Sequence, residues 1–291
     1  MNASLFVEVL INGICQGSIY ALFAIGYALI VGIVGMVSFT HGEVIMIGAF
    51  TAYFFANVSG NIFLNIIVCF ISTGILGIII YHVCYHRFLE APRHISLICT
   101  IGMSTLLQNL VQVYVTTATV GMPKLIPSGH IEIGNVMIQY YQIWVMVIVI
   151  LLCVVLSYFM NNTKLGCQLR AVSQDRTASA LVGIPVNRIT MLGNVIGCGI
   201  GGVGGLLYGI YYSSLSATMG GNAALKTFCA CVVGGLSNIV TSAASGLAIG
   251  IFENFGVTLT TSSMRNIVAF VFVIAVLLVK PEGFASKGGK K

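Results

Sequence analysis

Long apolar runs separated by short polar stretches make up most of the chain. A helix needs about 20 residues to cross a bilayer, and hydropathy marks eight runs that could do so. These runs are Leu5–Ile33, Glu43–Ala56, Ile62–Tyr81, Ile95–Thr116, Ile143–Met160, Ile189–Tyr212, Cys229–Ile251 and Ile267–Val279. We expect all of them to be helices, because an isolated strand cannot satisfy its backbone hydrogen bonds in lipid. The first run is long enough for one tilted helix or two shorter ones.

Composition narrows the protein class. The chain has 291 residues, of which 58% are hydrophobic and only 7% are charged, whereas a soluble domain carries about 25% charged residues. Soluble globular proteins, disordered chains and nucleic-acid-binding proteins are therefore excluded. The predicted fold class is all-α. We expect one polytopic membrane domain over residues 1–291, with about eight transmembrane helices and a re-entrant segment.

The basic residues predict the topology. Ten of the 13 lie in the loop Tyr81–His94, the loop Asn161–Arg188 and the tail from Lys280, and the positive-inside rule places all three in the cytoplasm. Three spans between the second loop and the tail would place the tail outside, so one more membrane segment is required there. The best position for it is Gly220–Phe255, where a break near Gly234–Asn238 would divide an apolar run into two legs. The N-terminus is outside if the first run crosses once and inside if it crosses twice.

Glycines recur at every fourth position along one predicted span. Small residues at this spacing form a smooth ridge that another helix can approach closely. The ridge consists of Gly193, Gly197, Gly201, Gly205 and Gly209. Gly13–Gly17 and Gly246–Gly250 repeat the pattern weakly. The ridge is either a sliding contact or a static close packing.

Motifs for catalysis and metal binding are absent from the sequence. The nine cysteines form no C-x-x-C pair, which argues against a disulfide framework or a zinc site. Asp175 is the only aspartate, and no Ser/His/Asp order is convincing. The G-x-G-x-x-G match at Gly199–Gly204 lies inside an apolar helix without a preceding strand, so it is not a nucleotide fingerprint. We expect no enzyme activity, no metal and no cofactor in this chain.

Polar side chains at membrane depth are candidates for a solute path. Gln108, Asn109 and Gln112 lie within one predicted span, where they would either line a path for a hydrophilic solute or form hydrogen bonds between helices. His41 and Glu43 mark the start of another span. They are a second candidate for the path, or a cap at the helix start, where a carboxylate is favoured.

The loop at about residues 161–188 predicts a docking element. A short helix over Asp175–Val182 would end at Gly183 and Pro185. Its apolar face would combine Ala171, Ala178 and Leu181 with Val182, and Arg170, Asp175 and Arg176 would lie outside this face. Together with Gly166, these residues predict a helix near the membrane surface that docks onto a partner. The alternative is an ordinary amphipathic connector.

At this point the sequence resembles a known family, the branched-chain amino acid ABC permeases of the LivH type. Four segments carry the resemblance: Gly35–Glu43, Gly166–Ile184, Val232–Asn238 followed by Gly246, and Lys280–Gly283. Ser38 and Thr40 depart from the residues common in that family. The resemblance implies an all-helical permease of the inner membrane that works by alternating access. It also implies ATP-binding cassette subunits that bind the ATP, a second permease chain that is related or identical, and an extracytoplasmic solute-binding protein.

Three other functions remain open at this stage. The same machine could carry another cargo, such as urea or short amides. An ion-coupled secondary transporter would need buried acidic coupling residues, and candidates such as Glu253 are few. The third alternative is a scaffold protein of the membrane.

Overall fold

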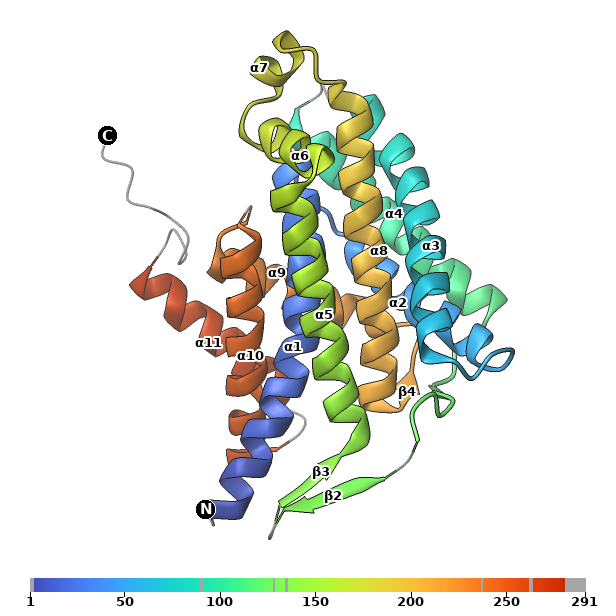
Figure 1. Ribbon diagram of the computed structural model, residues 1–291, viewed down its shortest axis with the longest axis vertical. Coiled ribbons are helices and arrows are strands. Elements are labelled where there is room, and N and C mark those ends of the chain that lie inside the picture. The colour runs from blue at the N-terminus through green and yellow to red at the C-terminus, as the bar shows by residue number, and fades with distance from the viewer. Residues whose placement is uncertain are drawn as a thin grey trace.

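The computed structural model describes residues 3–88, 92–127, 129–133, 136–236, 238–261 and 264–280, and the fold within them is mainly helical (Figure 1). The longer helices are α1 (Ala3–Val34), α2 (His41–Ala56), α3 (Ile62–Ile80), α4 (Arg93–Tyr114), α5 (Tyr140–Asn162), α6 (Lys164–Gln174), α8 (Val186–Tyr212), α9 (Met219–Gly234), α10 (Ile239–Leu259) and α11 (Arg265–Val279). The short ones are η1 (Tyr81–Tyr85), η2 (His86–Phe88) and α7 (Arg176–Leu181). The predicted all-helical class is confirmed.

Six helices are long and apolar enough to cross a membrane: Leu5–Val34, Ile62–Phe88, His94–Tyr114, Tyr140–Asn162, Val186–Tyr212 and Ile239–Leu259. The apolar helices His41–Ala56 and Arg265–Leu278 are shorter. At 1.5 Å per residue, the 16 residues of α2 cannot span a core of roughly 30 Å. The expected total of about eight full spans is therefore not confirmed, and neither is a re-entrant segment.

The break expected near Gly234–Asn238 is present, because α9 ends at Gly234 and α10 begins at Ile239. Gly235 has φ +96°, a conformation that favours glycine. The Asn238 side chain caps α10 by accepting from the backbone N–H groups of Val240 and Thr241. What hydropathy alone marks as one span, Cys229–Ile251, thus belongs to two helices. The tail beyond Lys280 lies outside the described residues.

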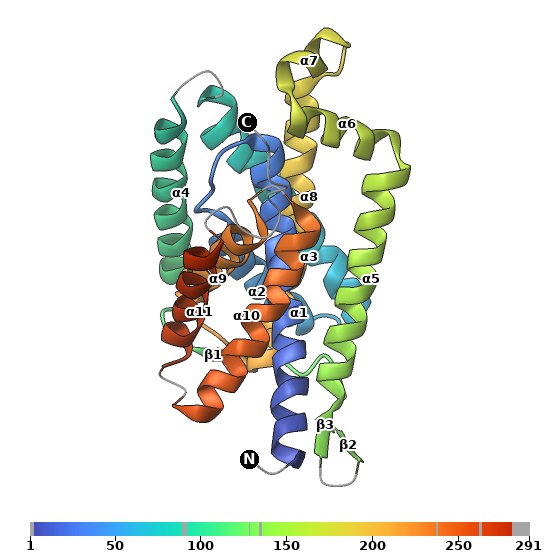
Figure 2. The same cartoon turned by 90° about the vertical axis from the view of Figure 1, so that its left-hand side faces the viewer.

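Two short antiparallel ladders, which the sequence analysis did not predict, lie at the end of the molecule where α1 begins and α8 ends (Figures 1 and 2). β2 (His130–Ile133) and β3 (Val136–Gln139) form a hairpin in which His130 lies opposite Gln139. β1 (Val120–Gly121) pairs with β4 (Ser214–Leu215). The opposite end carries α6 and α7.

The two halves of the chain repeat one order of helices in opposite directions. α1 ends at the α7 end of the molecule, where Arg176 reaches its last carbonyls, whereas α8 begins at that end and runs away from it (Figure 1). Each long helix is followed by a 16-residue helix, α2 or α9, and then by two further helices. The packing reflects this relation, because α1 packs most extensively on α10 and α8 on α3. Such inverted repeats recur in membrane transporters.

Close glycine contacts hold these pairs together. Gly17 on α1 and Gly250 on α10 are so close that a Cβ on either would overlap the other helix's backbone. The ridge of α8 lies against α1 and α2: a Cβ on Gly197 would be 2.7 Å from the Gly26 carbonyl oxygen, and one on Gly201 would be 2.7 Å from the His41 ring. The remaining ridge glycines meet Ile33 (Gly193), Ile45 (Gly205) and Leu215 (Gly209). The ridge faces protein along its whole length.

Candidate functional site

The end of the molecule opposite the β-hairpin is formed by α6 and α7. Thr163 starts α6 by accepting a hydrogen bond from the Gly166 N–H at 3.0 Å. Asp175 starts α7 in the same way, through the Ala178 N–H at 3.0 Å. Since α7 covers Arg176–Leu181, the short helix expected over Asp175–Val182 is confirmed. The residues before Asp175, which the sequence analysis assigned to a loop, form the helix α6.

The sequence signals for the end of α7 also act as expected. Gly183 adopts φ +86°, and its N–H donates to the Ala180 carbonyl while the Ile184 N–H donates to the Ser179 carbonyl. This pair of hydrogen bonds is the Schellman arrangement that commonly terminates a helix at glycine. The chain then turns into α8. Gly166 holds α6 close to α5, because a Cβ there would overlap the Phe159 carbonyl oxygen.

An apolar surface projects from α7. Leu181 and Val182 are 85% and 82% exposed, and Ala178 is exposed as well. Large apolar side chains at a protruding tip are typical of surfaces that another protein covers. Ala171 was expected on the same face, but this was wrong, because Ala171 lies on α6.

The three charged residues that we expected outside the apolar face each make a different contact. The Arg176 guanidinium donates to the Ile33 carbonyl at 2.6 Å and to the Val34 carbonyl. It therefore ties α7 to the C-terminal end of α1, where a cation is favoured. Asp175 caps α7. Arg170 is exposed and donates to the Asn161 side chain at 2.8 Å.

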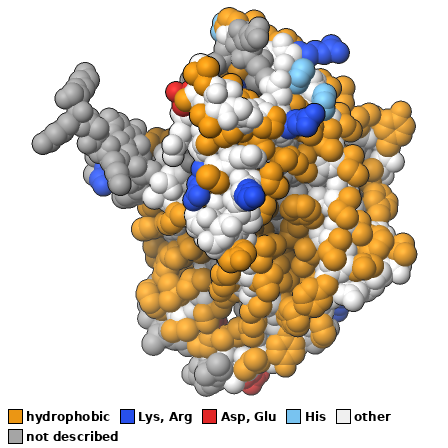
Figure 3. All heavy atoms as spheres, turned by 45° about the horizontal axis from the view of Figure 1, so that its top comes forward, with side chains coloured by type: hydrophobic (Ala, Val, Ile, Leu, Met, Phe, Trp, Pro, Cys, Tyr) orange, Lys and Arg blue, Asp and Glu red, His pale blue; other side chains and the backbone are white. Residues whose placement is uncertain are grey.

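Basic side chains gather at this end, while apolar side chains cover the visible flanks (Figure 3). Exposed basic residues here are Arg87, Lys164, Arg170 and Arg188. Exposed apolar residues include Ile67, Ile71 and Ile75 on α3 and Ile150, Val154 and Val155 on α5. This distribution fits a molecule whose flanks face lipid and whose α6–α7 end faces the cytoplasm.

The N-terminal ends of α2 and α9 meet inside the molecule. A Cβ on Gly42 would overlap the Gly220 carbonyl oxygen, and one on Gly220 would be 2.6 Å from Glu43 Oε2. Glu43 is 3% exposed, and its Oε1 accepts from Ser104 of α4 at 3.4 Å. The carboxylate thus lies at two helix N-termini, which favour negative charge. We call Glu43, Ser104 and Gly220 the polar centre.

His41 lies next to the polar centre and is 1% exposed. Its ring packs edge-on against Tyr27, with centroids 5.6 Å apart, and also contacts Gly201 of the ridge. Neither ring nitrogen has a hydrogen-bond partner among the described residues. The close aromatic and glycine contacts give His41 a packing role, whereas Glu43 has a neighbour on α4.

The three polar residues of α4 divide between two faces. Gln108 and Gln112 are half-buried, and Gln108 follows Ser104 by one turn on the side of α4 that meets α2. Asn109 is exposed and donates to the Thr105 carbonyl of its own helix at 2.7 Å. Asn109 also lines an open groove of about 590 Å³ on the outer face of α4. Only the two glutamines therefore share a side with the polar centre.

An open groove of about 800 Å³ lies between α5 and α10, over α1. Its walls are mainly apolar and include Ile25, Leu29 and Leu156. Arg170 and Asn161 lie at the α6 end. Since a hydrophilic solute needs polar partners when it leaves water, this groove is a poor candidate for its path.

Sequence reasoning missed a buried charged network in which Lys226 and Arg265 pair with Glu253. A signal for it was present. Three of the 13 basic residues lie outside the segments assigned to the cytoplasm, and they are Lys124, Lys226 and Arg265. An ionisable residue within an apolar segment is a functional candidate by default, and two of these three belong to the network.

Comparisons with known proteins assign the chain. A family model described as "Branched-chain amino acid transport system / permease component" matches residues 9–277. The high-affinity branched-chain amino acid transport system permease protein BraD of Pseudomonas aeruginosa is 34% identical, over 97% of this chain and 96% of the relative. The high-affinity branched-chain amino acid transport system permease protein LivH of Escherichia coli K12 is 31% identical over the same shares of both chains.

More distant relatives have other cargoes in their names. The ribose import permease protein RbsC of Haemophilus influenzae is 27% identical over 97% of this chain and 87% of its own length. No solved structure gives a significant match. The family model covers almost the whole chain and overlaps every membrane-spanning candidate described above. This chain belongs to the family of branched-chain amino acid transport system permease components.

Proposed function

We propose that this chain is the membrane-spanning subunit of an ABC importer that moves branched-chain amino acids into the cell. The observation that carries the proposal is the near full-length match to permeases whose names state this cargo. The protein resides in the inner membrane. ATP is bound and hydrolysed by partner subunits, and this chain itself carries no cofactor and no catalytic site.

The α6–α7 end docks onto the ATP-binding subunits. Support comes from the exposed apolar residues Ala178 and Leu181 on a helix that is capped at both ends. The basic side chains around them fit a cytoplasmic location. At the opposite end, near the β2–β3 hairpin, the solute-binding protein delivers the amino acid. A second permease chain, identical or related, completes the membrane part.

Motion passes from the ATP-binding subunits through α7 to the spans. Arg176 connects α7 to the last carbonyls of α1, and α1 is the most deeply buried span. Displacement of α7 would therefore act directly on the centre of the bundle. The glycine contacts between α1, α8 and α10 provide smooth surfaces along which the helices can shift.

The polar centre and the adjacent glutamines of α4 line the solute path in this proposal. An amino acid zwitterion needs hydrogen-bond partners while it crosses, because burying it without them is costly. Gln108 and Gln112 offer such partners without a fixed charge that would retain the solute. Replacing Gln112 with leucine is expected to reduce uptake while the complex still assembles.

Ala178→Asp tests the docking helix. The substitution places a charge in a surface that the ATP-binding subunit buries, which costs several kcal/mol when the charge is unpaired. We expect this variant to insert in the membrane but to lose co-purification of the ATP-binding subunit, or to uncouple ATP hydrolysis from uptake. Measurements are co-purification and leucine uptake by proteoliposomes that contain all partners.

Ala118→Asp is the matched control, since Ala118 is also exposed but follows α4 at the other end. It should leave co-purification unchanged. Normal co-purification and ATP-driven uptake by the Ala178→Asp variant would contradict the docking assignment. If the wild-type complex transports ribose, urea or a short amide instead of leucine, the proposed cargo is wrong. The docking assignment is not affected by that result.

A further inference from the structure

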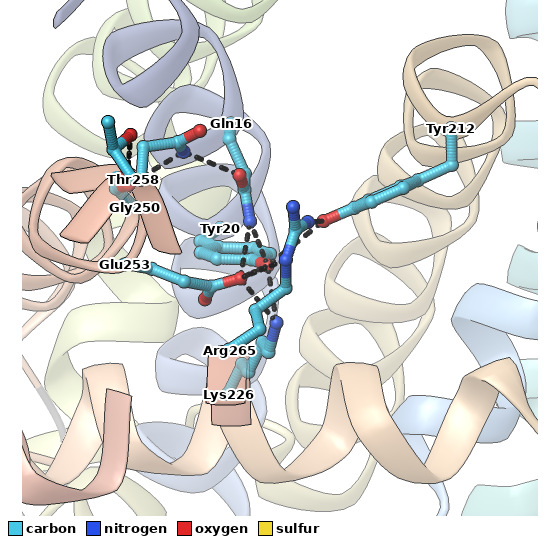
Figure 4. A network of polar contacts seen from close by, with 9 residues as sticks. Gln16, Tyr20, Tyr212, Lys226, Gly250, Glu253, Thr258 and Arg265 are labelled. Carbon is cyan, nitrogen blue, oxygen red and sulfur yellow. Dashed lines mark hydrogen bonds and ion pairs between the residues drawn. The ribbon is translucent and has the colours of Figure 1, made fainter. Parts of the chain in front are cut away.

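One buried carboxylate, that of Glu253 on α10, is contacted from three other helices (Figure 4). Its Oε1 accepts hydrogen bonds from Gln16 Nε2 at 2.7 Å and Lys226 Nζ at 2.8 Å. The Tyr20 hydroxyl donates to the same oxygen at 3.2 Å. Arg265 approaches it from α11, with its Nε at 3.5 Å. The contacts thus come from α1, α9 and α11, and Arg265 extends them to α8.

The charges of this network do not cancel. Glu253 is fully buried and the Lys226 side chain is 7% exposed, so these two form a compensated buried pair. Arg265 adds a second positive charge, and Glu253 is the only described carboxylate within 4.0 Å of either cation. The network therefore carries one excess positive charge. An uncompensated charge in a low-dielectric environment is costly, and an anion would remove that cost.

The excess charge lies where a ligand can reach it. The Arg265 side chain is 28% exposed. Its Nη1 donates to the Tyr212 hydroxyl at 2.6 Å, which is a neutral partner and leaves the charge uncompensated. A guanidinium has five N–H donors in a planar fork that fits a carboxylate with two parallel hydrogen bonds. Nη1 and Nε make these contacts, and among the described residues the Nη2 donors remain for a bound anion.

The network also lies at the relevant end of the molecule. Arg265 is the first residue of α11 and Tyr212 is the last of α8, at the end remote from α6 and α7 (Figure 2). In the proposed function, the solute-binding protein docks there and releases the amino acid. Of the two cations in the network, Arg265 is 28% exposed and Lys226 is 7% exposed, so Arg265 is the more accessible to the released amino acid.

We propose that Arg265 receives the α-carboxylate of the incoming amino acid, with Tyr212 orienting its guanidinium and the Lys226–Glu253 pair fixing the helices behind it. The proposal rests on the proposed function and specifies how the importer recognises its substrate class. Carboxylate binding neutralises the network. A sugar has no carboxylate and gains nothing from this excess charge.

The test uses the permease and ATP-binding subunits assembled in lipid nanodiscs without the solute-binding protein. Binding of radiolabelled leucine is measured, with 4-methylpentanoate and isoamylamine as competitors. We expect 4-methylpentanoate, which keeps the carboxylate, to compete, and isoamylamine, which lacks it, to compete much less. Arg265→Gln should weaken leucine binding about tenfold or more, as expected for the loss of a charged hydrogen-bonding partner.

Two further variants distinguish a role of Arg265 in leucine binding from a role in holding the helices together. Arg265→Lys keeps the charge but loses the fork, so binding should be partly retained. Tyr212→Phe removes only a hydroxyl and should weaken leucine binding a few-fold without loss of assembly. Lys124→Gln is the control, because it removes an exposed charge from the loop that follows β1. It should bind leucine as the wild type does.

The melting temperature of each ligand-free complex is recorded alongside. A lower melting temperature for Arg265→Gln with unchanged leucine affinity would show that the network only braces the helices, and would overturn the inference. Equal competition by the two analogues would also overturn it. Absence of ATP-driven leucine uptake by the complete wild-type importer would overturn the proposed function and this inference together, whereas the two preceding results overturn the inference alone.

Discussion

At the scale of single residues, Glu43 shows that a local sequence signal can predict a helix cap and still miss the residue's long-range contacts. A carboxylate in the first turn of a helix is a readable N-terminal signal, and Glu43 does lie in the first turn of α2. No local pattern indicates that it also faces the start of α9, because Gly220 is distant in sequence. The sequence thus predicts the cap, and only the fold reveals the polar centre.

Glu43→Gln tests the electrostatic role of this residue. The amide keeps the shape of the side chain but removes the negative charge from two helix N-termini. We expect the free energy of unfolding to fall by about 0.3–2 kcal/mol, the range for a charge at a helix end. The measurement is unfolding of the purified complex in detergent. Glu132→Gln, on the exposed β2 strand, is the control and should change stability little; equal effects of both substitutions would contradict the role.

At the scale of elements, helix boundaries marked by capping or helix-terminating residues were predictable, and boundaries without such residues were not. Asp175 and Gly183 delimit α7, and Gly235 with Asn238 separates α9 from α10. The hairpin β2–β3 and helix α6 were not predicted. The hairpin is short, and α6 is amphipathic and polar enough to resemble a loop. The glycine ridge in the sequence predicts which face of α8 is closely packed. It does not predict that α1 and α2 are the helices packed against that face.

A pair of identical substitutions tests the glycine packing. A Cβ on Gly205 of α8 would overlap the Ile45 carbonyl oxygen, whereas one on Gly102 of α4 would meet nothing within 4 Å. Gly205→Ala is expected to destabilise the protein by about 1–3 kcal/mol through overpacking. Gly102→Ala should be neutral or stabilising by up to about 1 kcal/mol, because alanine favours the helix. Denaturant titration of both variants checks the difference, and similar stabilities would exclude a rigid contact at Gly205.

At the scale of the whole molecule, the inverted order of the two halves was not visible in the sequence. The halves share a pattern of helix lengths but no obvious residues, and hydropathy merges α9 with α10. Charge placement predicted the orientation except for the side of the N-terminus, which depended on whether the first run crosses once or twice. The structure has one helix there, α1. By the count from the basic loops, one crossing places the start of α1 outside and α6 inside.

The native cysteines can check this orientation. Cys167 on α6 is exposed, whereas the remaining eight are buried or half-buried. We expect a membrane-impermeant maleimide to label Cys167 in inside-out vesicles and to leave it unlabelled in intact spheroplasts. Cys167→Ser should abolish the labelling and serves as the control. Labelling from the outer face would invert the topology and remove the basis for docking at α7.

The buried starts of α2 and α9 also constrain how the chain is made. Helix α2 leaves the ribosome long before α8 and α9, yet its first turn packs against Gly201 and Gly220 of those helices. Until they are synthesised, the start of α2 lacks the α8 and α9 backbone that buries it, and only α1 and α4 can partly shield the Glu43 carboxylate from water. The early half of the chain must therefore wait at the membrane surface or within the insertion machinery. Synthesis order makes α2 one of the first helices translated and one of the last to reach its final position.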